Sequence, residues 1–134
     1  MSHYTVLRTQ FVDVDALVKA LADLGLTHVE VYEKPKHLRG WLGGVRLRSA
    51  EIIIRRKHVG KASNDIGFKR QAGGTYTAII SEYDRRRYTD EWLGRLAQRY
   101  AYHVTLAKLT EQGFELVTRE QEKSRIHLTL RRMV

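Results

Sequence analysis

The chain of 134 residues contains no cysteine and one proline, Pro35. The absence of cysteine excludes disulfide bonds, thiolate metal ligands and thiol nucleophiles within this sequence. No apolar run approaches the ~20 residues that a membrane-spanning helix needs. The first residues, MSHYTVLRTQ, lack the basic and then apolar pattern of a signal peptide. We therefore expect a globular protein of the cytoplasm, or of the equivalent compartment of an organelle, with no membrane association.

Motifs of common enzymes and nucleotide-binding proteins are also missing. The glycines of GWLGG, residues 40–44, lack the lysine and hydroxyl residue of a phosphate loop, and no G-x-G-x-x-G occurs. No two of the six histidines lie three or four residues apart, so no helical metal pair forms. The carboxylates show no close pair that suggests acid–base catalysis. The sequence predicts no metal site and no cofactor, and it favours a protein without catalytic activity.

Positive charge is what the sequence has in excess, with a net charge of +9. Residues 34–87 carry +10, whereas residues 1–33 carry −3 and residues 88–134 carry +2. Such asymmetry indicates a polyanion or an acidic protein surface as partner, and the alternative is a solvated basic face. The candidate polyanion-binding residues are Arg55, Arg56, Lys57, Lys69, Arg70, Arg85, Arg86 and Arg87. The last three are flanked by Asp84, Asp90 and Glu91, so a local cluster of ion pairs is an equal alternative there.

Apolar periodicity predicts an α+β fold. Residues 4–11 are rich in β-formers, and Asp13 can cap a helix that Gly25 ends. A strand at 27–33 follows. Thr89 can cap a second helix, which carries an apolar stripe and ends at Gly113. The last segments, FELVTREQ and RIHLTLRR, predict a hairpin around EKS.

The middle of the chain is harder to interpret. Residues 34–50 predict a long loop or a twisted hairpin, and Trp41 within them is expected to fold back on the core, with stacking on a nucleic-acid base as the alternative. Residues 51–58, EIIIRRKH, predict a strand, and residues 72–74 predict a turn between two further strands. The expected architecture is a single domain, residues 1–134, in which two helices pack on an antiparallel or mixed sheet.

Several stretches occur together in a familiar order: DALVKALADLG, RGWLGG, NDIGF, GGTY and LAQRYAYH. In this respect the chain resembles the family of hypothetical chloroplast reading frame thirty-five, which occurs in cyanobacteria, algal plastids and other bacteria. The resemblance implies a small accessory or adaptor protein, often encoded near AAA-type ATPases, and a stromal location if the protein is plastid-borne. Asn64 departs from the family pattern, which has an aromatic residue before Asp-Ile-Gly. The arginine run at 85–87 departs from it too.

Three hypotheses for function follow. The first is an accessory protein that docks on a protein partner, with an AAA-type ATPase as one candidate. The second is a protein that binds the backbone of RNA or DNA through the basic residues given above. The third is an enzyme with an unfamiliar site, for which Asp65, His58 and His103 are the first residues to test. The sequence does not indicate an oligomeric state.

Overall fold

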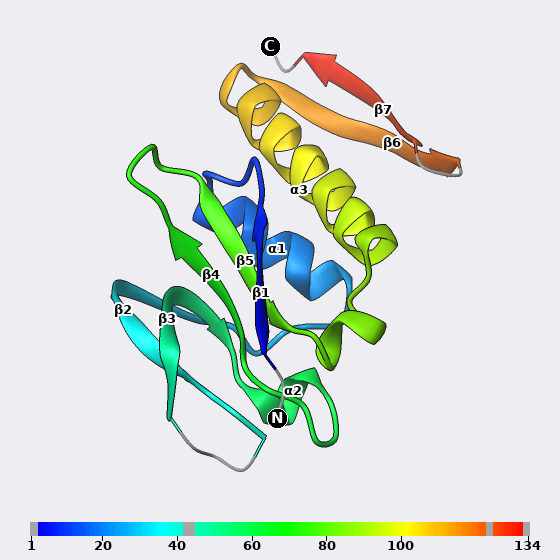
Figure 1. Cartoon of the computed structure of the whole chain (residues 1–134). Coiled ribbons are helices and arrows are strands. Elements are labelled where there is room, and N and C mark those ends of the chain that lie inside the picture. The colour runs from blue at the N-terminus through cyan, green and yellow to red at the C-terminus, as the bar shows by residue number, and fades with distance from the viewer. Residues whose placement is uncertain (1–2, 42–44, 123–124, 133–134) are drawn as a thin grey trace.

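The computed structural model describes residues 3–41, 45–122 and 125–132. Figure 1 shows the order of the elements along the chain. The strands are β1 (Tyr4–Arg8), β2 (Glu30–Arg39), β3 (Val45–Ile54), β4 (Ile66–Arg70), β5 (Tyr76–Ser81), β6 (Phe114–Glu122) and β7 (Arg125–Arg132). The helices are α1 (Val14–Asp23), α2 (Arg56–Val59), the 3-10 turn η1 (Asp84–Arg86) and α3 (Asp90–Glu111). The α+β class predicted from the sequence is confirmed.

Five strands form one antiparallel sheet in the order β1-β5-β4-β3-β2. Strands β1 and β5 pair with Leu7 opposite Ala78, and β4 and β5 pair with Phe68 opposite Ala78. The chain enters the sheet at one edge with β1, crosses to the other edge with β2, and returns strand by strand. β1 and β2 are therefore the two edge strands, which leaves one side of β1 without a neighbouring strand in the described part of the chain.

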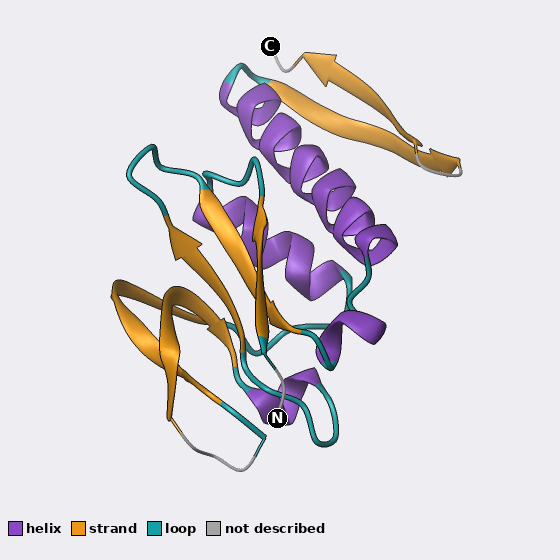
Figure 2. Ribbon diagram, viewed as in Figure 1, coloured by secondary structure: helices purple, strands orange, loops and turns teal. Residues whose placement is uncertain are grey.

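The two long helices lie on the same side of this sheet (Figure 2). The Asp13 side chain accepts a hydrogen bond from the Ala16 N–H at the start of α1, and the Thr89 hydroxyl accepts one from the Trp92 N–H at the start of α3. Both predicted caps are confirmed, and Gly25, with φ of +94°, follows the end of α1 as expected. The main core joins the helices to the inner faces of the strands, and fully buried members include Leu17, Phe68 and Leu96.

The β2–β3 hairpin bends over the other face of the sheet. Its register shifts twice, between Val31 and Lys36 and again between His37 and Arg39. The bend brings Leu38 onto Gly67, where a side chain would lie 2.7 Å from the Ala50 Cβ and 3.0 Å from a Leu38 methyl group. Leu38 and Ala50 form a second, smaller core cluster with Ile53 and Ile79. The twisted hairpin predicted for residues 34–50 is therefore part of the sheet.

The strand predicted over residues 51–58 is wrong at its second half. β3 ends at Ile54, and Arg56, Lys57 and His58 form the short helix α2. The three consecutive isoleucines before it are all buried, so they support a strand, whereas the Asp65 carboxylate draws the chain out of the sheet by binding the Arg56 N–H.

The closing hairpin is confirmed as β6 and β7, which pair antiparallel from Phe114 opposite Arg132 to Glu122 opposite Arg125. They form a separate two-stranded sheet that lies beyond α3, away from the five-stranded sheet (Figure 2). Among the described residues, no helix combines the length and the apolar character that crossing a bilayer requires.

Candidate functional site

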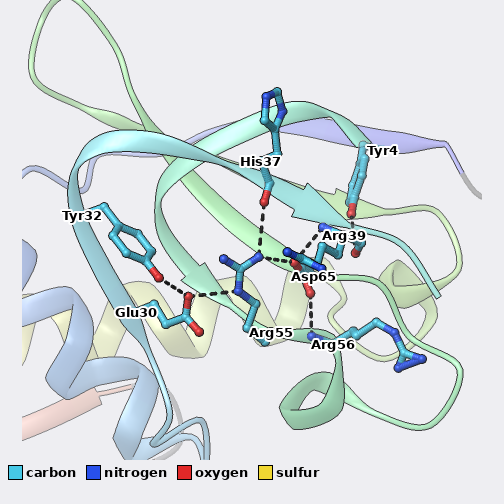
Figure 3. A network of polar contacts seen from close by, with 8 residues as sticks. All are labelled: Tyr4, Glu30, Tyr32, His37, Arg39, Arg55, Arg56 and Asp65. Atoms are coloured by element: carbon cyan, nitrogen blue, oxygen red, sulfur yellow. Dashed lines mark hydrogen bonds and ion pairs between the residues drawn. The ribbon is translucent and has the colours of Figure 1, made fainter. Parts of the chain in front are cut away.

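Asp65 lies at the centre of a polar network drawn in Figure 3, and its side chain is completely buried. One carboxylate oxygen accepts hydrogen bonds from the Arg39 N–H at 2.7 Å and the Arg55 guanidinium at 2.8 Å. The other oxygen accepts the Arg56 N–H at 2.7 Å. A buried carboxylate is stable only with such donors around it. Asp65 therefore joins the end of β2, the end of β3 and the start of α2, which is a structural role.

Arg55 extends this network toward the edge of the sheet. Its guanidinium contacts Glu30 at 2.9 Å and donates to the His37 carbonyl oxygen at 3.2 Å, while the Tyr32 hydroxyl donates to Glu30 at 2.5 Å. Partial burial alone would raise the pKa of the Glu30 carboxyl, but the hydrogen bonds from Tyr32 and Arg55 hold it below its usual value. Burial would lower the pKa of Arg55, and its hydrogen bond with Asp65 raises it instead. Both charges are therefore held in pairs.

A second buried network begins at the adjacent residue, Asn64. The Asn64 amide donates to the Ser81 hydroxyl, its backbone N–H donates to Asp84, and Ser81 also donates to Asp84. The Asn64 side-chain oxygen accepts the Trp41 N–H at 2.9 Å. The expectation that Trp41 folds back on the core is wrong, because its side chain remains 50% exposed. The network holds the Trp41 backbone while the indole faces solvent.

The predicted polyanion-binding residues occupy several places. Arg55 is engaged as described, and Arg85 pairs with Asp90 and the Tyr88 carbonyl oxygen. Arg86 stacks on the Tyr83 ring. Arg87 lies against α2, since its guanidinium donates to the Val59 carbonyl oxygen.

The remaining basic residues divide between two ends of β4. Arg56 and Lys57 lie on α2, near the start of β4, whereas Lys69 and Arg70 lie at the far end of that strand. Lys69 donates to the Ser49 hydroxyl there. The structure thus brings Arg56, Lys57 and Arg87 to the same end of the sheet and separates Lys69 and Arg70 from them. Polyanion binding by the set stays a prediction.

The three residues of the enzyme hypothesis each have different neighbours. Asp65 is enclosed by its donors, His103 bonds Asp23 at 2.7 Å, and the His58 ring stacks on the His28 ring with centroids 4.1 Å apart. Within the described residues, no group of three or more histidine or acidic side chains is placed to hold a metal ion. The three residues therefore do not form one constellation.

An apolar groove of about 430 Å³ runs between β1 and α3. The β1 side contributes Leu7 and the segment that continues to Phe11, and the α3 side contributes Leu93, Ala97, Tyr100, Ala101 and Val104. Among the described residues that line it, Arg8 is the one that carries a charge. The Tyr100 hydroxyl accepts the N–H groups of Val12 and Asp13, so the floor of the groove is fixed to the start of α1.

Comparison with known proteins identifies the family. The family described as "Protein of unknown function (DUF1257)" matches residues 20–129. The chain belongs to this family. The protein described as "Uncharacterized protein ycf35" from Cyanophora paradoxa is 30% identical over 124 residues, covering 92% of this chain and 90% of that protein. Its namesake from Guillardia theta is 30% identical over 135 residues, covering 98% of both chains. The namesake from Pyropia yezoensis is 27% identical over 132 residues, covering 92% and 90%. No solved structure matches.

Membership of the DUF1257 family confirms the resemblance noted in the sequence, and the network geometry explains its NDIGF segment. Asn64 and Asp65 anchor the two polar networks, and Gly67 accommodates Leu38. The sequence did not indicate the groove, although its apolar periodicity predicted the stripe of the second helix. Leu96 from that stripe enters the core, whereas Leu93, Ala97, Tyr100 and Val104 line the groove. The signal was the pair of alanines, Ala97 and Ala101, which lie about one turn apart between the larger residues Leu93 and Val104 of the same stripe.

Proposed function

We propose that this member of the DUF1257 family is an adaptor that holds an extended segment of a partner protein beside β1. The proposal is carried by one observation: the outer edge of β1, beside which no described strand lies, borders an apolar groove. Strand addition uses the hydrogen bonds of an unpaired edge for affinity and pockets for alternate side chains for specificity. The family resemblance favours an AAA-type ATPase as the protein that carries the segment.

The pairing of β1 identifies which backbone groups face outward. The Glu82 N–H donates to the His3 carbonyl oxygen, and the register makes Thr5–Ile80 and Leu7–Ala78 the next hydrogen-bonded pairs. The N–H and C=O groups of Val6 and Arg8 therefore point away from β5, toward the free edge. An added strand can bond to them without disturbing the sheet.

The groove supplies the side-chain half of such a site. Ala97 and Ala101 are exposed, and their small side chains leave room between α3 and the edge of the sheet. Alternate apolar residues of an added strand would fill that room, at about 25 cal/mol for each Å² of apolar surface removed from water. The Arg8 side chain and the net charge of +9 favour a segment with flanking acidic residues.

The test uses two pairs of matched variants in co-purification from native extract. Val6→Pro removes an outward N–H and leaves the pairing with β5, whereas Thr5→Pro breaks that pairing. Ala101→Glu places a charge in the groove, whereas Ala107→Glu places it on an exposed part of α3 outside the groove. We expect a partner that the wild type and Ala107→Glu retain and that Val6→Pro and Ala101→Glu lose, with the folded state of both preserved by circular dichroism. Retention of the same partner by all folded variants would overturn the proposal.

A further inference from the structure

A second cavity, of about 340 Å³, is lined by residues that follow the end of α1 and by residues at the start of α3. Figure 1 shows these two helix ends on the same side of the molecule. Its apolar walls are Leu24, Leu26 and Trp92, and its polar groups include His58, Arg87 and Arg95. We call it the cationic pocket. It belongs to neither of the buried networks around Asn64 and Asp65, and it is separate from the groove beside β1.

The charged groups that line the cationic pocket are of one sign. Among the described residues, the lining contains two guanidinium groups, one imidazole and no carboxylate. Arg95 is exposed, and among the described residues no hydrogen bond or ion pair joins it to another group. Glu91, one helical turn earlier, makes no ion pair with it within 4.0 Å. Two arginines that line one pocket without an ion pair to a described carboxylate repel one another, and a bound anion would relieve that repulsion.

The arrangement of Arg87 is fixed by its surroundings. Its guanidinium donates to the Val59 carbonyl oxygen at 3.3 Å, and the Tyr88 hydroxyl donates to the same oxygen at 2.7 Å. A Cβ at residue 60 would lie 3.3 Å from the Arg87 guanidinium. Glycine at this position therefore leaves space for that guanidinium. The Tyr88 hydroxyl thus already donates its proton to Val59, and Tyr88 forms part of the pocket wall. Arg87 has further N–H groups that a ligand can accept from.

His58 lines the pocket beside the two arginines. His28 stacks on His58 with an angle of 3° between the ring planes. Desolvation, the neighbouring His28 ring and the Lys57 ammonium lower the pKa of His58, and Glu30 acts in the opposite direction. Glu30 is itself paired with Arg55. The lowered pKa favours the neutral form of His58, and a bound anion would favour its protonated form.

We infer that the cationic pocket binds the phosphate group of a small phosphate monoester, with Arg87 and Arg95 contacting the phosphoryl oxygens and His58 donating beside them. Arginine presents planar, paired donors that match phosphate oxygens. A cavity of this volume is in the usual range for small-molecule sites, and the leucine and tryptophan walls suit an apolar or aromatic organic part. The pocket is a single cavity rather than a track of charges, which favours a small ligand over a nucleic-acid backbone.

The test is calorimetric titration of the full chain with inorganic phosphate and with phenyl phosphate at constant ionic strength. We expect phenyl phosphate to bind more tightly than phosphate, because only the ester fills the apolar part. Arg95→Ala, at an exposed residue with no partner to lose, should weaken binding about 10-fold or more, as expected for loss of charge-assisted hydrogen bonds. Arg86→Ala removes the same charge outside the pocket and should leave the affinity unchanged within about 2-fold.

Protonation gives an independent measurement. A bound anion stabilises the charged imidazole, so affinity should rise as the pH falls from 8 to 7, a range in which a phosphate monoester keeps its second charge because its second pKa is about 6. NMR should show the His58 signal titrating at higher pH when phenyl phosphate is present. The inference is overturned if neither ligand binds at millimolar concentration, or if Arg86→Ala and Arg95→Ala weaken binding equally. It is also overturned if a short oligonucleotide binds more tightly than phenyl phosphate. None of these results depends on the groove variants, so the two proposals fail separately.

Discussion

Gly67 shows how a single residue decides the position of a whole hairpin. Leu38 and Ala50 approach it so closely that any side chain there meets one of them. This position therefore has no room for a side chain, and the neighbouring residues Leu38 and Ala50 are fully buried. The segment NDIGF carries three such constraints in four residues: two buried polar anchors and one close approach.

Gly67→Ala tests this packing. Its Cβ would lie 2.7 Å from the Ala50 Cβ, so the hairpin must shift, and we expect the free energy of unfolding to fall by about 1–3 kcal/mol. Urea denaturation measures the change. Gly73→Ala is the matched control, because a Cβ there meets nothing within 4 Å. The double variant Gly67→Ala, Ala50→Gly should recover part of the loss, and no recovery would show that Leu38 alone makes the contact.

At the scale of elements, α1 and α3 are joined by a surface cluster. Asp23 at the end of α1 accepts from Arg99 at 2.8 Å and from His103 at 2.7 Å, both on α3. Partial burial would raise the pKa of the Asp23 carboxyl, but the bonds from His103 and Arg99 hold it below its ordinary value of 3.8. The carboxylate therefore stabilises the folded state at pH values above that ordinary value, and this contribution disappears as the pH falls through the lowered one.

A double-mutant cycle of Asp23→Asn and Arg99→Gln should give a coupling energy of about 0.5–1 kcal/mol at pH 7. The cycle removes the separate effect of a charge at the end of α1. Denaturation at a pH below the lowered pKa of Asp23 should give a much smaller coupling, because the carboxyl is then largely protonated. A coupling that persists unchanged in acid would mean that the two side chains interact by packing and not by charge.

The elements also show what the sequence could predict. Caps such as Asp13 and Thr89 act within a few residues, so both long helices and the class of the fold were predictable. The end of β3 at Ile54 was not, because the carboxylate that draws out Arg56 belongs to Asp65, on a later segment. The groove and the cationic pocket were not predictable for the same reason. Each is made by side chains that only the tertiary fold brings together, such as Leu7 with Ala97.

For the molecule as a whole, the two sheets differ in their contribution to the main core. Every described member of the main core precedes residue 101, and β6 pairs with β7 and with no strand of the larger sheet. We therefore expect a chain without residues 114–134 to unfold cooperatively, with a urea m-value reduced roughly in proportion to the surface lost. A truncated chain with no cooperative transition would show that the hairpin is needed to cover α3.

The two tryptophans sit in opposite surroundings. Trp41 is 50% exposed at the tip of the β2–β3 hairpin, whereas Trp92 is 6% exposed and forms a wall of the cationic pocket. Their fluorescence should therefore be separable, with Trp41 emitting at longer wavelength and open to aqueous quenchers. Replacing Trp41 by phenylalanine leaves Trp92 as the single tryptophan, in the same pocket lining as His58 and Arg95. The protein would then carry its own optical reporter of anything that enters that cavity.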